Sequence, residues 1–165
     1  MDARMKRLAW LIAFAWPIAL TAQDAPASKL AKRYGYTYEA ILYPQKTPQE
    51  ALQAVVKCLD GKKIDYLLAH LTDPKFVDES VAQYARSYKG NDDARTILGF
   101  ERLVRETVAH FQEDPLLIKE LRQYLKDAAW EVQEDSAIGT LKNASPRRVF
   151  FRKLEERWFL ENKQQ

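Results

Sequence analysis

The side chains that could carry out chemistry are few and widely spaced in this sequence. It has two histidines, His70 and His110, and one cysteine, Cys58. Asp65 precedes His70 by five residues, which on a helix places their side chains about 140° apart, so they do not form a proton-transfer pair. We therefore predict that both histidines are ordinary core or surface residues. Cys58 is predicted to be a buried structural thiol rather than a nucleophile.

No stretch of the sequence has the spacing of a cofactor or metal site. Asp92 and Asp93 are adjacent, which is typical of a loop that begins a helix rather than of a pair of metal ligands. The five glycines form no phosphate-binding loop or nucleotide fingerprint, and no nucleophile elbow occurs. A lone cysteine allows no intrachain disulfide and no cysteine-based zinc site. The sequence thus predicts a domain without a metal or cofactor.

The first residues have the layout of a secretory signal peptide. Arg4, Lys6 and Arg7 precede an apolar run from Leu8 to Leu20, and small residues follow. The run has 13 residues, which is too short to cross a bilayer comfortably. We predict a signal peptide over residues 1–22 and an exported protein, periplasmic or secreted, with no stable membrane span after cleavage. An uncleaved N-terminal anchor is the alternative.

Composition and charge limit the classes of partner. With 47% hydrophobic and 30% charged residues, the chain has globular composition, and its length suits one domain with its own core. The formal net charge is +3, and residues 1–22 contain three cations and one carboxylate, so removing their +2 leaves +1. A nearly neutral domain lacks the excess of cations with which proteins neutralise phosphates, so we predict no nucleic-acid partner.

Residues 23–46 are predicted to form an extended, tyrosine-rich arm. Tyr34, Tyr36 and Tyr38 alternate, which is typical of an extended segment with its rings on one side. Such an arm packs across the domain, or it offers its rings as a flat platform for a ligand.

Helical periodicity extends over residues 47–126. Thr47, Pro48 and Glu50 have the spacing of an N-cap, a first-turn proline and a capping box, and Gly61 is a typical stop. The first helix therefore covers 47–61. Apolar residues recurring at intervals of three and four predict further helices over 64–71, 77–88, 99–112 and 115–126.

Residues 127–162 consist of short alternating segments separated by turn residues, which predicts four strands in an antiparallel meander. The fold class predicted is therefore α+β, with N-terminal helices packed on a curved C-terminal antiparallel sheet. Residues 47–165 form a single domain in this prediction.

The last of these segments, VFFRKLEERWFLEN (149–162), is predicted to be a hairpin with Glu155 and Glu156 as its loop. A helix over the same residues would crowd its aromatic side chains among charges. The hairpin pairs Leu154 with Arg157. It places four residues on the face turned toward the helices: Val149, Phe151, Trp158 and Leu160.

Two parts of the chain resemble the nuclear transport factor 2-like superfamily, also called the ketosteroid isomerase or cystatin-like α+β cone. TPQEALQAVVKCLDGKKIDYLLAHL (47–71) is similar to its opening helices, including an aspartate near the start of the second, here Asp65. AWEVQEDSAIGTL (129–141) and the hairpin are similar to its final strands. The resemblance implies a conical pocket in which some members catalyse a reaction, many bind a ligand and others assemble. It leaves residues 74–126 as a helical insert.

Three functions fit such a domain. The first is an exported, non-catalytic module that binds a small apolar ligand or a protein partner. The second is a cofactor-free isomerase or lyase with Asp65 or another buried acid as its base. The third is a structural domain that forms a homodimer through its sheet, with Phe150 and Phe159 on the exposed face. Aromatic residues on inward-facing stripes are the pocket candidates, although the same residues fit a plain core: Tyr84, Phe111, Trp130, Phe151 and Trp158.

Overall fold

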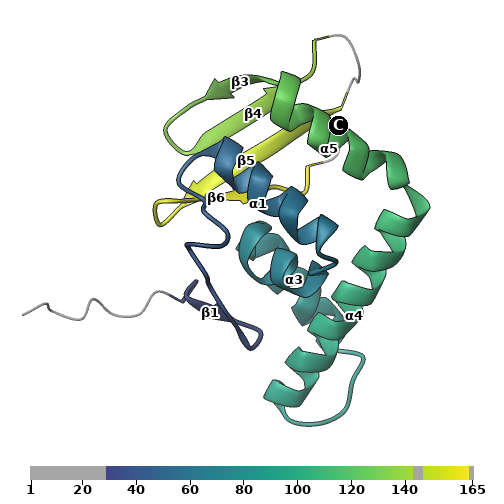
Figure 1. Ribbon diagram of the computed structural model, residues 1–165. Helices are drawn as coiled ribbons and strands as arrows, with labels where there is room; N and C mark the ends of the chain where they lie inside the picture. The colour runs from purple at the N-terminus through teal and green to yellow at the C-terminus, as the bar shows by residue number, and fades with distance from the viewer. Residues whose placement is uncertain (1–28, 143–146, 164–165) are drawn as a thin grey trace, which may run out of the picture.

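The computed structural model describes residues 29–142 and 147–163 (Figure 1). The predicted signal peptide, 1–22, and the beginning of the predicted arm lie outside these ranges. Within the ranges, no helix combines the length and the hydrophobicity that are needed to cross a bilayer.

The predicted α+β class is confirmed, because a series of helices precedes a four-stranded antiparallel sheet (Figure 1). The strands follow one another as a meander, in the order β3-β4-β5-β6. A small hairpin, β1-β2, precedes the helices. The elements are β1 (Lys32–Arg33), β2 (Tyr36–Thr37), α1 (Pro48–Asp60), α2 (Ile64–Tyr66), the π-helix η1 (Leu67–Leu71), α3 (Pro74–Ala85), α4 (Asp92–Glu113), α5 (Pro115–Asp127), β3 (Ala129–Val132), β4 (Ser136–Thr140), β5 (Arg148–Leu154) and β6 (Arg157–Leu160).

Helix α1 forms where its local signals agree. Thr47 Oγ1 accepts a hydrogen bond from the Glu50 amide at 3.1 Å, and Pro48 occupies the first turn. The Glu50 carboxylate accepts one from the Lys46 amide at 2.9 Å, one residue before the position that a capping box predicts. The apolar face is buried against the rest of the core and includes Leu52, Val55, Val56 and Leu59.

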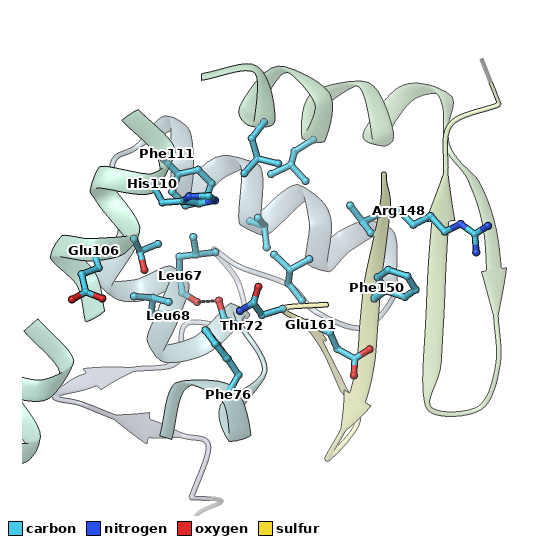
Figure 2. Close-up of a pocket in the computed structure, with 17 residues that line it drawn as sticks. Leu67, Leu68, Thr72, Phe76, Glu106, His110, Phe111, Arg148, Phe150 and Glu161 are labelled. Carbon is cyan, nitrogen blue, oxygen red and sulfur yellow. Dashed lines mark hydrogen bonds between the residues drawn. The ribbon is translucent and has the colours of Figure 1, made fainter. Parts of the chain in front are cut away.

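The second predicted helix is not a regular α-helix. Only Ile64–Tyr66 is α-helical, and Leu67–Leu71 forms the π-helix η1, closed by the Thr72 amide donating to Leu67 O at 3.0 Å. All residues of η1 are buried. The prediction of a regular helix was wrong, and this segment packs on both sides. Leu67 faces a cavity under α4 and α5 (Figure 2), whereas His70 bonds Tyr36 O in the arm.

Helix α4 packs closely in its first half only. A Cβ at Gly99 would lie 2.7 Å from Val81 O, so glycine is what allows the backbones of α3 and α4 to approach there. The last fully buried residue of α4 is Leu103. The predicted buried stripe continues through Val104, Thr107, Val108 and Phe111, but these residues are only half-buried, since α4 then runs beside a hollow.

The β5–β6 hairpin has the predicted register. Leu154 pairs with Arg157, and Phe151 pairs with Leu160. Both loop residues, Glu155 and Glu156, have positive φ, at 46° and 62°, so two glutamates form a tight turn that more often contains glycine or asparagine. The predicted inward residues pack in the core, with Val149, Phe151 and Trp158 fully buried and Leu160 partly buried.

The free edge of β6 is covered by two loops. Gln45 pairs with Trp158 through two hydrogen bonds, one from the Trp158 amide at 2.9 Å and one from Gln45 Nε2 at 2.6 Å. The Asp73 amide donates to Leu160 O at 2.8 Å. These contacts tie the arm and the end of η1 to the sheet, so this edge is closed to further strands.

The described part of the arm packs across the domain, as one of the two alternatives predicted, but it is not one extended row. Tyr34 and Gly35 form the turn between β1 and β2, both with positive φ. The Tyr34 ring stacks on Phe100, with centroids 4.3 Å apart. Tyr38 lies over the Arg157 guanidinium, whose Cζ is 4.0 Å from the ring centroid. These rings are engaged with the protein itself and do not form a free platform.

Candidate functional site

A cavity of about 400 Å³ lies between the α4–α5 pair and the sheet (Figure 2). We call it the α4–α5 cavity. Its walls come from α1, η1, α3, α4, α5, β5 and β6. It lies where the second half of α4 packs against the core with side chains that are only partly buried. A volume of this size is typical of small-molecule sites.

Most of the wall is apolar, and its aliphatic residues come from elements that also build the core. Leu67 and Leu68 point into the cavity from η1, and Phe76 closes the bottom of the view (Figure 2). The apolar lining is Val55, Leu67, Leu68, Phe76, Phe111, Leu117, Leu121, Val149, Phe150 and Leu160.

A few polar groups interrupt this wall. His110 turns its ring into the cavity beside Phe111 (Figure 2), and the two ring centroids are 6.2 Å apart. Thr72 and Thr107 also line it, but their hydroxyls donate to the backbone oxygens of Leu67, at 3.2 Å, and Leu103, at 2.8 Å. His110 is therefore better placed than the threonines to orient a ligand.

Glu106 lines the rim of the cavity but is engaged elsewhere. Its carboxylate accepts hydrogen bonds from the Tyr84 hydroxyl and from Arg102 Nε, the latter at 2.8 Å. Hydrogen bonding from Tyr84 and then from Arg102 lowers the pKa of Glu106. A carboxylate held in its charged form by two donors is poorly tuned to act as a general base near neutral pH.

One of the five pocket candidates from the sequence, Phe111, lines this cavity. Phe151 and Trp158 are core residues, fully buried against the helices, and the partly buried Trp130 ring packs 5.9 Å from that of Phe151. Tyr84 lies outside on α3, bonded to Glu106. The aromatic stripes thus located the core rather than the cavity, because sheet residues that face the helices are the most closely packed.

Asp65, the candidate base, does not line the cavity. Its carboxylate accepts a hydrogen bond from the Tyr66 amide at 2.8 Å, and it lies near the Tyr36 hydroxyl, whose pKa it raises. The expected exposed patch on the outer sheet face is also absent at Phe150 and Phe159, which are 7% and 0% exposed. Those two rings therefore offer no surface for a dimer.

The remaining reactive side chains are structural. Burial raises the pKa of the Cys58 thiol to about 11, so it is inert near neutral pH, as predicted for a structural cysteine. His70 is fully buried, and its Nε2 donates to Tyr36 O at 2.9 Å. Within residues 29–142 and 147–163, no cluster of three or more histidine, cysteine or carboxylate side chains is arranged to hold a metal ion.

Most of the cavity wall was not identified from the sequence. Leu117 and Leu121 lie on a helical stripe that has the same spacing as a core stripe, so pattern alone does not separate the two. The available signal was the position of His110 next to Phe111 near the end of a long helix.

Comparison with known proteins identifies no relative: no family model, curated protein or solved structure matches the chain.

Proposed function

We propose that this chain is an exported, non-catalytic domain that binds a small, largely apolar molecule in the α4–α5 cavity. The observation that carries the proposal is the cavity itself, about 400 Å³ with a mainly apolar wall and few polar groups. The non-catalytic part is supported by Asp65, which lies away from the cavity, and by Glu106, which is held as a bonded carboxylate.

A cavity-filling variant tests the binding site directly. Thr107 is half-buried on the cavity side of α4, so Thr107→Trp is expected to fill the space and to abolish binding of a neutral probe such as decanol. Gln112→Trp, on the exposed side of the same helix, is the matched control. Binding is measured by isothermal calorimetry and by the rise in melting temperature of the mature protein.

The proposal fails if no alkanol of any length stabilises the mature protein. It also fails if Thr107→Trp, with an unchanged circular dichroism spectrum, binds decanol as well as the Gln112→Trp control does.

Export is the second part of the proposal, and the layout of residues 1–22 supports it. Mass spectrometry of the protein recovered from cells is expected to show a chain that begins near residue 23. Recovery of the intact chain in the cytosolic fraction would contradict it.

We also propose a relationship to the nuclear transport factor 2-like superfamily. The order of helices before an antiparallel meander supports it, together with a hollow between helices and sheet. An experimental structure whose sheet order differs from that of the superfamily would reject the relationship.

A further inference from the structure

The sheet has two edges, and only one of them is covered by other parts of the described chain. At β6, the residues whose backbone groups point away from the sheet are Trp158 and Leu160. Gln45 bonds Trp158 through its backbone oxygen and its side chain, and the Asp73 amide donates to Leu160 O. The opposite edge is formed by β3, the outermost strand on that side (Figure 1). No residue of β3 lines the α4–α5 cavity, so this edge is a separate feature of the surface.

Two residues of β3 direct their backbone groups away from the sheet. The Gln133 amide donates to Ser136 O at 2.8 Å, which makes these two residues a hydrogen-bonded pair. Such pairs alternate along an antiparallel ladder, so Glu131 bonds β4, whereas Trp130 and Val132 point their N–H and C=O groups outward. No described residue forms a hydrogen bond with any of these outward groups.

Among the described residues, nothing closes the β3 edge. Proteins block an open edge with proline, lysine, a bulge or a covering segment. The strand reads Ala-Trp-Glu-Val, and its register with β4 is continuous, without a bulge. The Val132 side chain is 53% exposed beside the free backbone groups. The edge is therefore a template to which an extended peptide can add as a further strand.

The segment that forms this edge, 127–135, is acidic. It contains Asp127, Glu131, Glu134 and Asp135 and no lysine or arginine. All four side chains are exposed, and none of them forms a salt bridge with a described residue. Arg148 lies on β5, and β4 separates it from β3. The edge thus presents negative charge without a matching cation.

From these observations we infer that the β3 edge binds an extended segment of another protein, one that carries lysine or arginine at alternate positions. The segment adds antiparallel to β3 and exchanges main-chain hydrogen bonds with Trp130 and Val132. Its residue between these two pairs lies opposite Glu131, at the close spacing of a non-hydrogen-bonded pair, where a cation meets the carboxylate. Because only two residues of β3 offer hydrogen bonds, charge supplies much of the selectivity.

A second copy of this chain is a poorer occupant of the same edge. Two β3 strands paired about a two-fold axis would bring the same four carboxylates together, and like charges opposite one another destabilise a sheet. A basic segment relieves this repulsion, which is why charge favours it over a homodimer.

The test uses two fluorescein-labelled peptides on the mature protein: Thr-Lys-Val-Lys-Val-Lys-Thr and the same sequence with glutamate in place of each lysine. Both peptides place valines beside the outward residues of β3 and a charged residue opposite Glu131. Fluorescence anisotropy is expected to show the lysine peptide binding at least about tenfold more tightly than the glutamate peptide. Rising salt is expected to weaken the binding.

Two variants locate the binding site. The Val132 N–H points away from β4, so Val132→Pro removes a donor that no bond within the described domain uses. It is expected to weaken binding of the lysine peptide roughly tenfold, whereas the matched control Val132→Thr keeps the N–H and the affinity. Glu131→Lys is expected to weaken the lysine peptide and to admit the glutamate peptide. If Val132→Pro does not fold, Glu131→Lys decides the result.

Each contrary result overturns the inference. Absence of binding by the lysine peptide at millimolar concentration does so, and so do equal affinities for the two peptides. If Val132→Pro and Glu131→Lys, both with wild-type circular dichroism spectra, keep the full preference for the lysine peptide, the peptide binds elsewhere. A dimer in sedimentation that Val132→Pro converts to a monomer would show that a second copy occupies the edge. None of these results bears on decanol binding, which tests the α4–α5 cavity separately.

Discussion

The two sides of this domain use similar aromatic residues in opposite ways. On the arm side, formed by residues 29–46 with η1 and β6, rings pack on one another or are covered. The ring centroids of Tyr43 and Tyr66 are 4.4 Å apart, and Arg157 covers Tyr38. On the α4–α5 side, Phe111 is half-buried beside a hollow of about 400 Å³. The comparison indicates that the arm side is closely packed, whereas the α4–α5 side gives up packing and leaves a cavity.

The largest expected difference between the two sides comes from deleting one ring on each. Trp158 is 4% exposed, and its backbone is paired with Gln45, so Trp158→Ala is expected to lower the free energy of unfolding by about 3–5 kcal/mol. Phe111→Ala is expected to cost about 1 kcal/mol, since this ring already borders empty space. Urea unfolding of the mature protein measures both. Equal costs would show that the two sides are packed alike.

The two halves of α4 offer a second comparison. Gly99→Ala would ordinarily strengthen a helix, but its methyl group would lie 2.7 Å from Val81 O, a backbone atom that does not yield easily. We expect a net loss of about 1–3 kcal/mol, from overpacking between α3 and α4. Thr107→Ala, in the loosely packed half, is expected to change stability much less. A gain in melting temperature for Gly99→Ala would contradict the close approach of the two helices.

A change of pH tests the arm side through His70, which is fully buried. Burial lowers the pKa of His70 below its ordinary value of 6.5, and the nearby cations Arg157 and Arg33 act in the same direction. Its Nε2 is bonded to Tyr36 O, and its Nδ1 has no hydrogen-bond partner among the described residues. The folded state therefore resists a proton that the unfolded state accepts once the pH falls below 6.5.

Stability is thus expected to fall as the pH drops below about 6.5, with a slope from His70 of at most about 1.4 kcal/mol per pH unit. His70→Gln keeps a side-chain N–H donor but does not titrate, so its unfolding free energy should depend less steeply on pH over this window. Urea titrations at several pH values measure the difference between the two slopes. Identical slopes would show that His70 is equally easy to protonate in the folded and unfolded states.

The parts that the sequence predicted well are those specified by neighbouring residues. The cap at Thr47 and the stop at Gly61 bound α1, and the turn at Glu155 and Glu156 sets the hairpin register, because alternation around a two-residue loop allows one register that buries Phe151. No contact with a distant segment is needed to predict either.

The parts that it did not predict depend on what faces each element across space. The residues of η1 have α-helical spacing, yet the segment is a π-helix that packs on both sides. The two halves of α4 have the same apolar stripe, yet Leu103 meets the core and Phe111 borders the cavity. A stripe predicts which side of a helix turns inward, but it does not say whether a partner fills the space, which is why only Phe111 among the pocket candidates lies at the cavity.

The smallest expected effect concerns how α5 is held above the cavity. Arg122 on α5 forms an ion pair with Asp60 on α1, and both side chains are about half-exposed. Water and salt screen such a pair, so Asp60→Asn is expected to change the free energy of unfolding by no more than about 1 kcal/mol, and by less at high salt. Leu121 lies on the same helix and is 5% exposed. We expect Leu121→Ala to lower the free energy of unfolding by about 2–5 kcal/mol. If Asp60→Asn proved as costly as Leu121→Ala in urea unfolding, surface charge rather than apolar contact would keep α5 in place. In that case the affinity of the cavity for decanol would fall as the ionic strength rises. If apolar contacts hold α5 in place, we expect the affinity for decanol to be independent of salt.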